Sequence, residues 1–579
     1  MTALRPALAL AVGVALFGVA LGPATRARAA GAAPEEIASL ARVAEKQLDE
    51  WRFGEGRASI TELARLAPGA PQTLYLQGYL GFLEGNYAEA VHKLEAALAA
   101  GPRDATAVNA RELRGLAAEA RDAVKDHREE RFGHFLFRYP AVDAVLVPYA
   151  REALEAAYRA LHDDLGFEAE LPIRIEIYRS PSDLAAVSSL TVAEVARTGT
   201  IALCKWARLM VTSPRALATG YPWLDTINHE LVHYAVSSLT HDRAPVWLQE
   251  GLAKFLERRW REPAGGRIPP AMEHMLAKAL RSGKLISFEA MHPSMAKLPS
   301  AEDATLAFAE VANAVAHLYA DKGAAGLRDA VKRVADGQDA REAVAAAAGV
   351  TWAEFERGWR AYMAAQKYKT FPGIDFPTTH IRKAGAIASQ RKPSEDEALT
   401  PSGKPSTSTA AALKFLRLGN MLLRRDRPRA AVIEYEKGAK AVTSAGHGGD
   451  AAAAWLFPVK LGRTYLVLGE ADRALAALDP VRVIYPDLPW PHVIAGEAEL
   501  AKGAPATAVL ELRAALASNP FDPEVHCTLA SAYQKLPQGG GPASAAADTS
   551  AAADAAVRPS QDVIAREQQF CRELAGGAQ

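Results

Sequence analysis

Three pairs of residues in the C-terminal third of the chain recur at one fixed spacing, and this spacing restricts the fold of that region. The members of each pair are 34 positions apart: Gly462 and Gly496, Ala474 and Ala508, and Pro486 and Pro520. Such a period fits two packed helices and a turn, in which the glycine and alanine let the helices approach and the proline ends the second helix. One unit cannot bury its apolar face alone, so neighbouring units stack into a solenoid. The spacing therefore predicts stacked helical hairpins over residues 411–536.

This pattern resembles the tetratricopeptide repeat. An earlier unit has Gly419, Ala431 and Tyr435 at matching offsets. The N-terminal region, residues 34–128, fits one further unit through Leu74, Gly78, Ala90, Leu94, Ala97 and Pro102. Two interpretations of the C-terminal repeats stay open: a helical layer that packs on the rest of the protein, or a groove that docks a peptide or protein.

The segment from residue 226 to 235 contains two histidines on one expected helical face. His229 and His233 are four residues apart, and a helix has 3.6 residues per turn, so both imidazoles can reach a single metal ion. Glu230 lies beside that face, where it could take a proton from a water at the metal. The His-Glu-x-x-His pattern is a zinc-peptidase signature, but a motif this short also arises by chance. It therefore needs a further ligand.

The segment after Pro245 supplies that ligand. It is predicted to begin a second helix, with apolar residues at helical spacing: Trp247, Leu248, Leu252, Phe255 and Leu256. Glu250 follows His233 by 17 residues, and two antiparallel helices would bring its carboxylate to the open side of the histidines. Two histidines, one glutamate and a water form a known catalytic zinc set. The alternative is a lone carboxylate that caps a helix.

Together the two segments resemble the gluzincin metallopeptidases of the peptidase MA-like group. Their second segment reads Pro-x-Trp-Leu-x-Glu-Gly-x-Ala, which this chain matches with Pro245, Trp247, Leu248, Glu250, Gly251 and Ala253. The resemblance implies one zinc ion per chain on His229, His233 and Glu250, with Glu230 as the catalytic base. It also implies an α+β fold: a gluzincin-type catalytic domain over residues 130–370, with a small twisted sheet and helices, flanked by the α-solenoid hairpins.

The middle of the chain has elements that suit this fold. Strands are predicted at residues 135–139, 173–178 and 207–212. Helices are predicted at residues 147–165, 306–322, 325–335 and 352–363.

The resemblance also raises a question about activity. In peptidase MA-like sequences a tyrosine commonly opens the helix that corresponds to residues 306–322, and a hydroxyl there would stabilise the oxyanion. This chain has Phe308 instead, which keeps the ring and lacks the hydroxyl. Either another donor serves, with Tyr234 and His241 as the candidates, or the enzyme is slow.

The N-terminus reads as a secretory signal peptide over residues 1–29. Arg5 precedes an apolar run from Ala7 to Leu21, and Ala27-Arg28-Ala29 offers a cleavage site. An uncleaved membrane anchor is the alternative, although the run is short for a membrane span. The mature chain is therefore expected in a bacterial periplasm or outside the cell.

Two stretches contain few large apolar residues, and we expect a linker at residues 371–410 and a loose low-complexity tail at 537–579. With only three cysteines, no disulfide framework is expected to hold the fold. Whether Cys527 and Cys571 pair is left open, and no cysteine has metal-ligand spacing.

The 67 basic and 67 acidic residues balance, which argues against a nucleic-acid partner or an anionic membrane surface. We expect a zinc-dependent peptidase whose repeats dock a substrate or protein partner. The alternative is a non-catalytic tetratricopeptide scaffold with an idle, zinc-stabilised peptidase fold. The presence of Glu230, which is not a ligand, favours activity.

Overall fold

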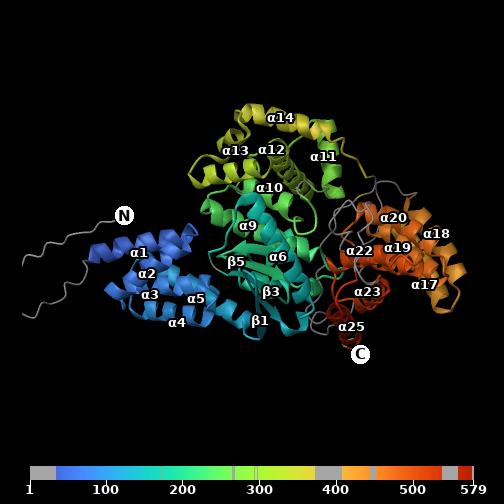
Figure 1. The fold of residues 1–579 in the computed structure, drawn as a ribbon, viewed down its shortest axis with the longest axis horizontal. Coiled ribbons are helices and arrows are strands. Elements are labelled where there is room, and N and C mark those ends of the chain that lie inside the picture. The colour runs from blue at the N-terminus through green and yellow to red at the C-terminus, as the bar shows by residue number, and fades with distance from the viewer. Residues whose placement is uncertain are drawn as a thin grey trace, which may run out of the picture.

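The computed structural model describes residues 34–374, 407–443, 451–537 and 558–576, apart from positions 103, 171, 264, 265, 267, 293, 296, 297, 372 and 373. The predicted signal peptide lies outside the described residues, as does most of the predicted linker. The chain is mostly helical, with one mixed sheet, and is of the α+β class (Figure 1). None of the described helices is both long and apolar enough to cross a membrane.

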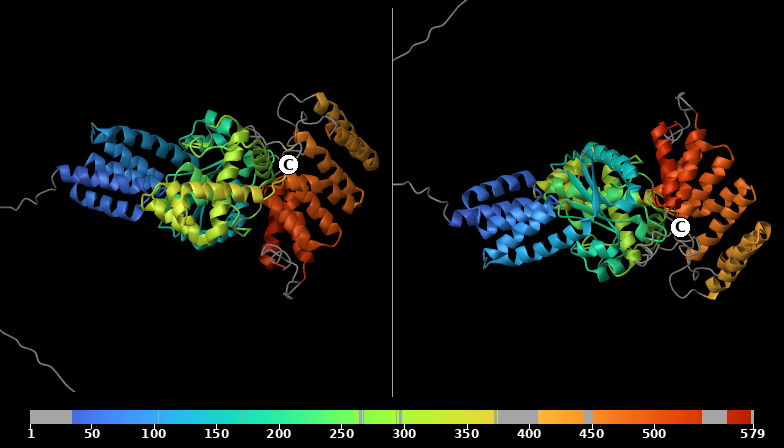
Figure 2. Two further views of the ribbon diagram at one scale, coloured as in Figure 1. Left: turned by 90° about the horizontal axis from the view of Figure 1, so that it is seen from above. Right: turned by 90° about the horizontal axis from the view of Figure 1, so that it is seen from below.

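Three parts lie in a row. The N-terminal helices and the C-terminal repeats lie on opposite sides of a central domain that contains the sheet (Figures 1 and 2). We call residues 407–537 the C-terminal array. The N-terminal helices are α1 (Pro34–Asp49), α2 (Phe53–Leu66), α3 (Pro71–Leu83), α4 (Tyr87–Ala99) and α5 (Ala105–Val124).

The small residues of the repeat pattern lie where paired helices touch. A Cβ added to Gly78 of α3 would lie 2.6 Å from Leu94 of α4, and one added to Gly496 would lie 2.7 Å from Leu512. Either distance is too short for a carbon contact, so the hairpins close only because glycine occupies these positions. The predicted reason for the period is confirmed.

The sheet has the order β1-β2-β3-β5-β4. Its strands are β1 (His127–Phe132), β2 (Phe135–Pro140), β3 (Ile173–Tyr178), β4 (Ala202–Lys205) and β5 (Arg208–Thr212). The central strands β2, β3 and β5 run parallel, and both edge strands pair antiparallel. The predicted strands are β2, β3 and β5. Sequence reasoning missed both edges, because β1 is mostly charged and β4 has only four residues.

A buried ionic cluster joins the N-terminal helices to the sheet. Glu176 on β3 is fully buried and lies 3.1 Å from Arg208 and 3.5 Å from Arg174. The hydroxyls of Tyr87 on α4 and Tyr178 each donate to its carboxylate at 2.6 Å. Burial raises the pKa of Glu176, but Arg208 and Arg174 outweigh it and lower the pKa to about 2. The cluster therefore holds an ionised carboxylate between two layers of structure.

The helices of the central domain surround the sheet and then continue above it (Figure 1). They include α6 (Leu146–Leu165), α9 (Trp223–Thr240), α10 (Val246–Leu256), α11 (Pro270–Ser282), α12 (Ala301–Ala335), α13 (Ala340–Ala348) and α14 (Trp352–Ala365). The two helices predicted at 306–322 and 325–335 are the halves of α12, which breaks at Gly323 (φ 60°, ψ −158°). A backbone angle in this region favours glycine.

The C-terminal array packs against the central domain. Its helices are α17 (Thr407–Arg424), α18 (Pro428–Thr443), α19 (Ala451–Val467), α20 (Ala471–Ile484), α21 (Pro489–Ala501), α22 (Pro505–Leu516) and α23 (Pro523–Lys535). Ala517, just after α22, belongs to the same apolar core as the central domain. The packing that one of the two interpretations predicts is therefore observed, and the docking interpretation stays open.

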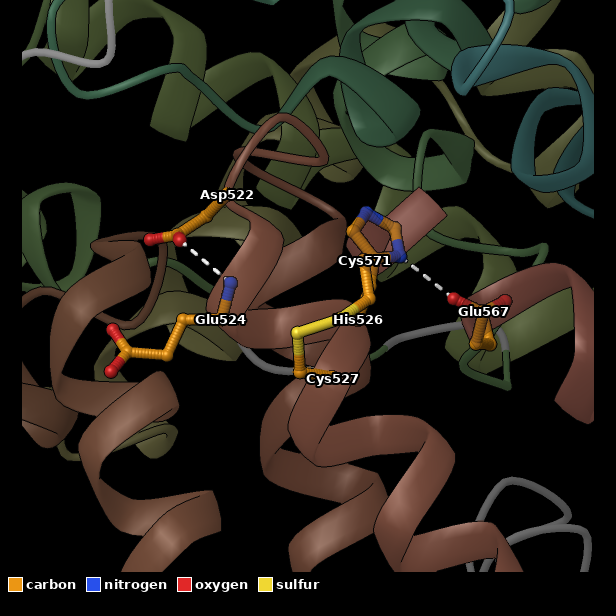
Figure 3. The surroundings of a disulfide bond; sticks show 6 residues. All are labelled: Asp522, Glu524, His526, Cys527, Glu567 and Cys571. Atoms are coloured by element: carbon orange, nitrogen blue, oxygen red, sulfur yellow. Dashed lines mark hydrogen bonds and ion pairs between the residues drawn. A yellow bond between two sulfur atoms is a disulfide. The ribbon is translucent and has the colours of Figure 1, made fainter. Parts of the chain in front are cut away.

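The prediction of a loose tail over residues 537–579 is wrong for its last part. Residues Gln561–Gly576 form helix α25, which lies against α23 and is joined to it by a disulfide between Cys527 and Cys571 (Figure 3). Glu567 of α25 is buried, 2.7 Å from His526 of α23 and 2.7 Å from the hydroxyl of Tyr149 on α6. Helix α25 is therefore held by a covalent bond and by buried hydrogen bonds of Glu567, neither of which its composition reveals.

Candidate metal centre

The two helices expected to carry the ligands form an antiparallel pair. Helix α9 carries His229, Glu230 and His233, and ends at His241, whose left-handed backbone (φ 53°) stops the helix. Asp242 is also left-handed, so the chain reverses before Pro245 precedes α10. Glu250 lies in the second turn of α10, where it faces α9. The structure thus brings together the three predicted ligands, which lie on two segments of the chain.

The coordinating atoms converge on one point. The Nε2 atoms of His229 and His233 are 3.1 Å apart, and Oε2 of Glu250 lies 3.3 Å from the first and 3.5 Å from the second. In a tetrahedral zinc site with bonds of about 2.0–2.1 Å, neighbouring ligand atoms are about 3.3–3.4 Å apart. The donor set and its spacing therefore fit a zinc ion. Among the described residues this is the one cluster of three histidine, cysteine or acidic side chains close enough to hold a metal.

Further side chains fix the orientation of both imidazoles. Nδ1 of His229 donates to Glu257 at 3.0 Å, and Nδ1 of His233 donates to the amide oxygen of Gln249 at 3.2 Å. Lys254 pairs with Glu257 at 3.0 Å. Such contacts select the tautomer that turns Nε2 toward a metal. Sequence reasoning missed both Glu257 and Gln249, although Glu257 follows Glu250 by seven residues and so lies two turns further on the same helical face.

The acidic surroundings change the protonation of the site. Burial and the charge of Lys254 lower the pKa of His229, but Glu250 and Glu257 outweigh them and raise it to about 9. The pKa of Glu250 is held far below its usual value because the two histidines outweigh its burial. The cluster is therefore an acidic pocket that favours a cation, either protons on the histidines or a metal ion.

Glu230 lies beside this cluster and is not part of it. Its side chain is buried, and the backbone of Cys204 on the edge strand β4 hydrogen-bonds to its carboxylate. Burial raises the pKa of Glu230, although the charges of His233 and His229 act against this. A carboxylate whose pKa is raised by burial is more basic than an exposed one, which suits a group that accepts a proton.

The candidate oxyanion donors are not at the site. Tyr234 is buried in the core, where its ring packs on Trp51 (5.1 Å) and Phe167 (6.1 Å). His241 caps the far end of α9. The alternative in which Tyr234 or His241 replaces the missing hydroxyl therefore gains no support from these positions. The centre of the Phe308 ring lies 5.9 Å from the ammonium group of Lys254, which follows Glu250 by four residues on α10.

A family model described as the Peptidase MA superfamily matches residues 153–365, which contain α9, α10 and the cluster. No curated protein matches.

Two solved structures give weak overall likenesses. The tetratricopeptide domain of P58(IPK) is 12% identical over 87% of this chain and 89% of its own, with a TM-score of 0.20. The Naa15/Naa10 complex bound to HypK-THB is 12% identical over 86% of this chain, which spans 62% of that one, with a TM-score of 0.17. Values this low carry no argument about fold or function.

Proposed function

We propose that the chain is a zinc-dependent peptidase of gluzincin type. His229, His233 and Glu250 hold the metal, and Glu230 acts as the general base. When bound there, zinc makes a water molecule more acidic and polarises the carbonyl of the peptide bond. Glu230 takes the proton of the attacking water and then gives it to the leaving amine.

The spacing of the three ligand atoms carries this proposal. Separations of 3.1, 3.3 and 3.5 Å match the edges of one tetrahedral face. The family match over residues 153–365 supports a peptidase in the same region.

The idle-scaffold alternative has less support from the geometry. Structural zinc sites are closed by four protein ligands, whereas catalytic sites keep one position open. Among the described residues three ligands come together, and Glu230 lies beside them with a raised pKa. A purely structural site needs no such base.

The proposed substrate is a peptide or an unfolded protein. The repeats are proposed to dock this substrate or a separate protein partner. We further propose export to the periplasm or the medium. The signal-like N-terminus and the Cys527–Cys571 disulfide support this, since disulfides persist in oxidising compartments.

Metal removal tests the proposed function. The purified protein is expected to cleave an unfolded protein substrate. Treatment with a zinc chelator should remove about 90% or more of this activity, in proportion to the zinc that is removed, and addition of zinc should restore it. Fragments are followed by mass spectrometry, with chelator-treated serine protease as a control for effects on the substrate. Cleavage that persists without metal would overturn the assignment.

A further inference from the structure

We propose that the C-terminal array is a positioning element of the metal centre, because it holds the first turn of α9 and the residue after Glu257. This inference rests on the proposed function, since the centre that it concerns is the zinc site proposed above. It makes the array an integral part of the catalytic unit, whereas a tethered docking module would leave the metal site unaffected.

The end of α22 and the turn after it form hydrogen bonds with the start of α9, the helix that carries the two histidines. The carbonyl of Leu516 accepts a hydrogen bond from the indole of Trp223 at 3.0 Å, and the carbonyl of Ser518 accepts one from the backbone of Tyr221 at 3.0 Å. Trp223 is the first residue of α9 and is fully buried. It precedes His229 by six residues, about 9 Å along the helix. The end of α9 nearest His229 is therefore held by the array.

Gly220 shows how closely the two parts approach. Its backbone is left-handed (φ +69°), and an added Cβ would lie 2.3 Å from the carbonyl oxygen of Ser518. Five residues earlier in the chain, the guanidinium of Arg215 lies 4.0 Å from the centre of the Phe521 ring. A side chain at position 220 must therefore displace the array turn or the loop that leads into α9.

A second contact reaches the end of α10. Arg258 pairs with Asp225 at 3.3 Å and with Asp487 of the array at 3.7 Å. Asp225 lies one turn before His229 on α9, and Arg258 directly follows Glu257, whose carboxylate holds the His229 ring. Both helices that carry ligands are thus attached to the array close to the metal site.

Two glycine substitutions separate positioning from general destabilisation. Gly220→Ala and Gly283→Ala both place a side chain at a left-handed position (φ +69° and +68°), but nothing lies within 4 Å of a Cβ at Gly283. The two variants therefore have the same backbone strain, and only Gly220→Ala pushes on the array. Hydrogen exchange of the Tyr221 amide, which donates to Ser518, reports whether the array turn has moved.

Metal affinity is the deciding measurement, made by competition for zinc and by the visible spectrum of bound Co²⁺. We expect Gly220→Ala to bind zinc about 10- to 100-fold more weakly, the usual cost of disturbing the supports of metal ligands. Its Co²⁺ spectrum should change as well, while Gly283→Ala keeps the wild-type affinity and spectrum. Faster exchange at Tyr221 with unchanged affinity and spectrum would overturn the inference.

A pair of charge variants keeps the test decisive if Gly220→Ala does not fold. Asp487→Asn removes the array's partner of Arg258, and Glu152→Gln removes the partner of Arg513 in another contact between the array and the central domain. Only Asp487→Asn is expected to weaken zinc binding. The weakening should be about 3- to 10-fold, at the low end of what is usual for residues that support metal ligands without touching the metal. Equal affinities in both variants would contradict a positioning role. Wild-type protein that binds no metal would instead refute the proposed function itself.

Discussion

Glu230→Gln is expected to lower peptide hydrolysis by about 100- to 10,000-fold, which is the usual contribution of a general base. The amide has nearly the same volume as the carboxylate but cannot take a proton from water. Because Glu230 is not one of the three converging ligands, the variant should still bind zinc with wild-type affinity. Turnover of an unfolded protein substrate and zinc content would be measured on the same preparation.

An exposed glutamate provides the matched control. Glu302 lies on the surface and pairs with Lys278 through exposed side chains, so Glu302→Gln should leave turnover unchanged. If Glu230→Gln retained full turnover, Glu230 would not be the base. If wild type and variant were equally inert on all substrates, the scaffold alternative would gain support.

Glu176→Gln is expected to destabilise the protein by about 3–5 kcal/mol, because it leaves buried arginines without their anionic partner. The measurement is chemical unfolding at neutral pH, followed by circular dichroism. The surface pair Arg57–Glu84 gives the control, since Glu84→Gln should cost less than about 1 kcal/mol. Equal midpoints for the two variants would show that the buried cluster contributes no more than a surface ion pair.

The same carboxylate gives a pH dependence of known sign. The pKa of Glu176 is about 2 in the folded chain and 4.5 as the ordinary value, so the folded state binds its proton less readily than the unfolded state does. Its contribution of about 3 kcal/mol is present above pH 4.5 and is lost as the pH falls toward 2. In Glu176→Gln this part of the acid dependence should disappear.

The candidate site could be predicted largely because helical geometry is local. The spacing of His229 and His233 fixes their common face, and the apolar pattern around Trp247 predicts a second helix that returns Glu250 to the first. The helical hairpins could be predicted for a similar reason. Gly78 and Gly496 each allow a close contact between the two helices of one repeat, so the pattern lies within a short stretch of sequence.

The parts that sequence reasoning missed depend on contacts between distant segments. Arg174 and Glu176 alternate with isoleucines on β3 as if they faced water, but helices from the N-terminal region cover that face. Helix α25 follows a stretch of low complexity, and its order depends on Cys527 and on Tyr149, more than 400 residues away. No local pattern contains such pairings.

Zinc content tests the central claim most directly. The purified protein is expected to contain about one zinc ion per chain, as catalytic sites with three protein ligands do. His233→Ala, which removes one of these ligands, should lose the metal on dialysis while the Glu302→Gln control keeps it. Both are measured by elemental analysis against protein concentration. A wild-type chain without zinc, or His233→Ala with stoichiometric and tightly held zinc, would contradict the account.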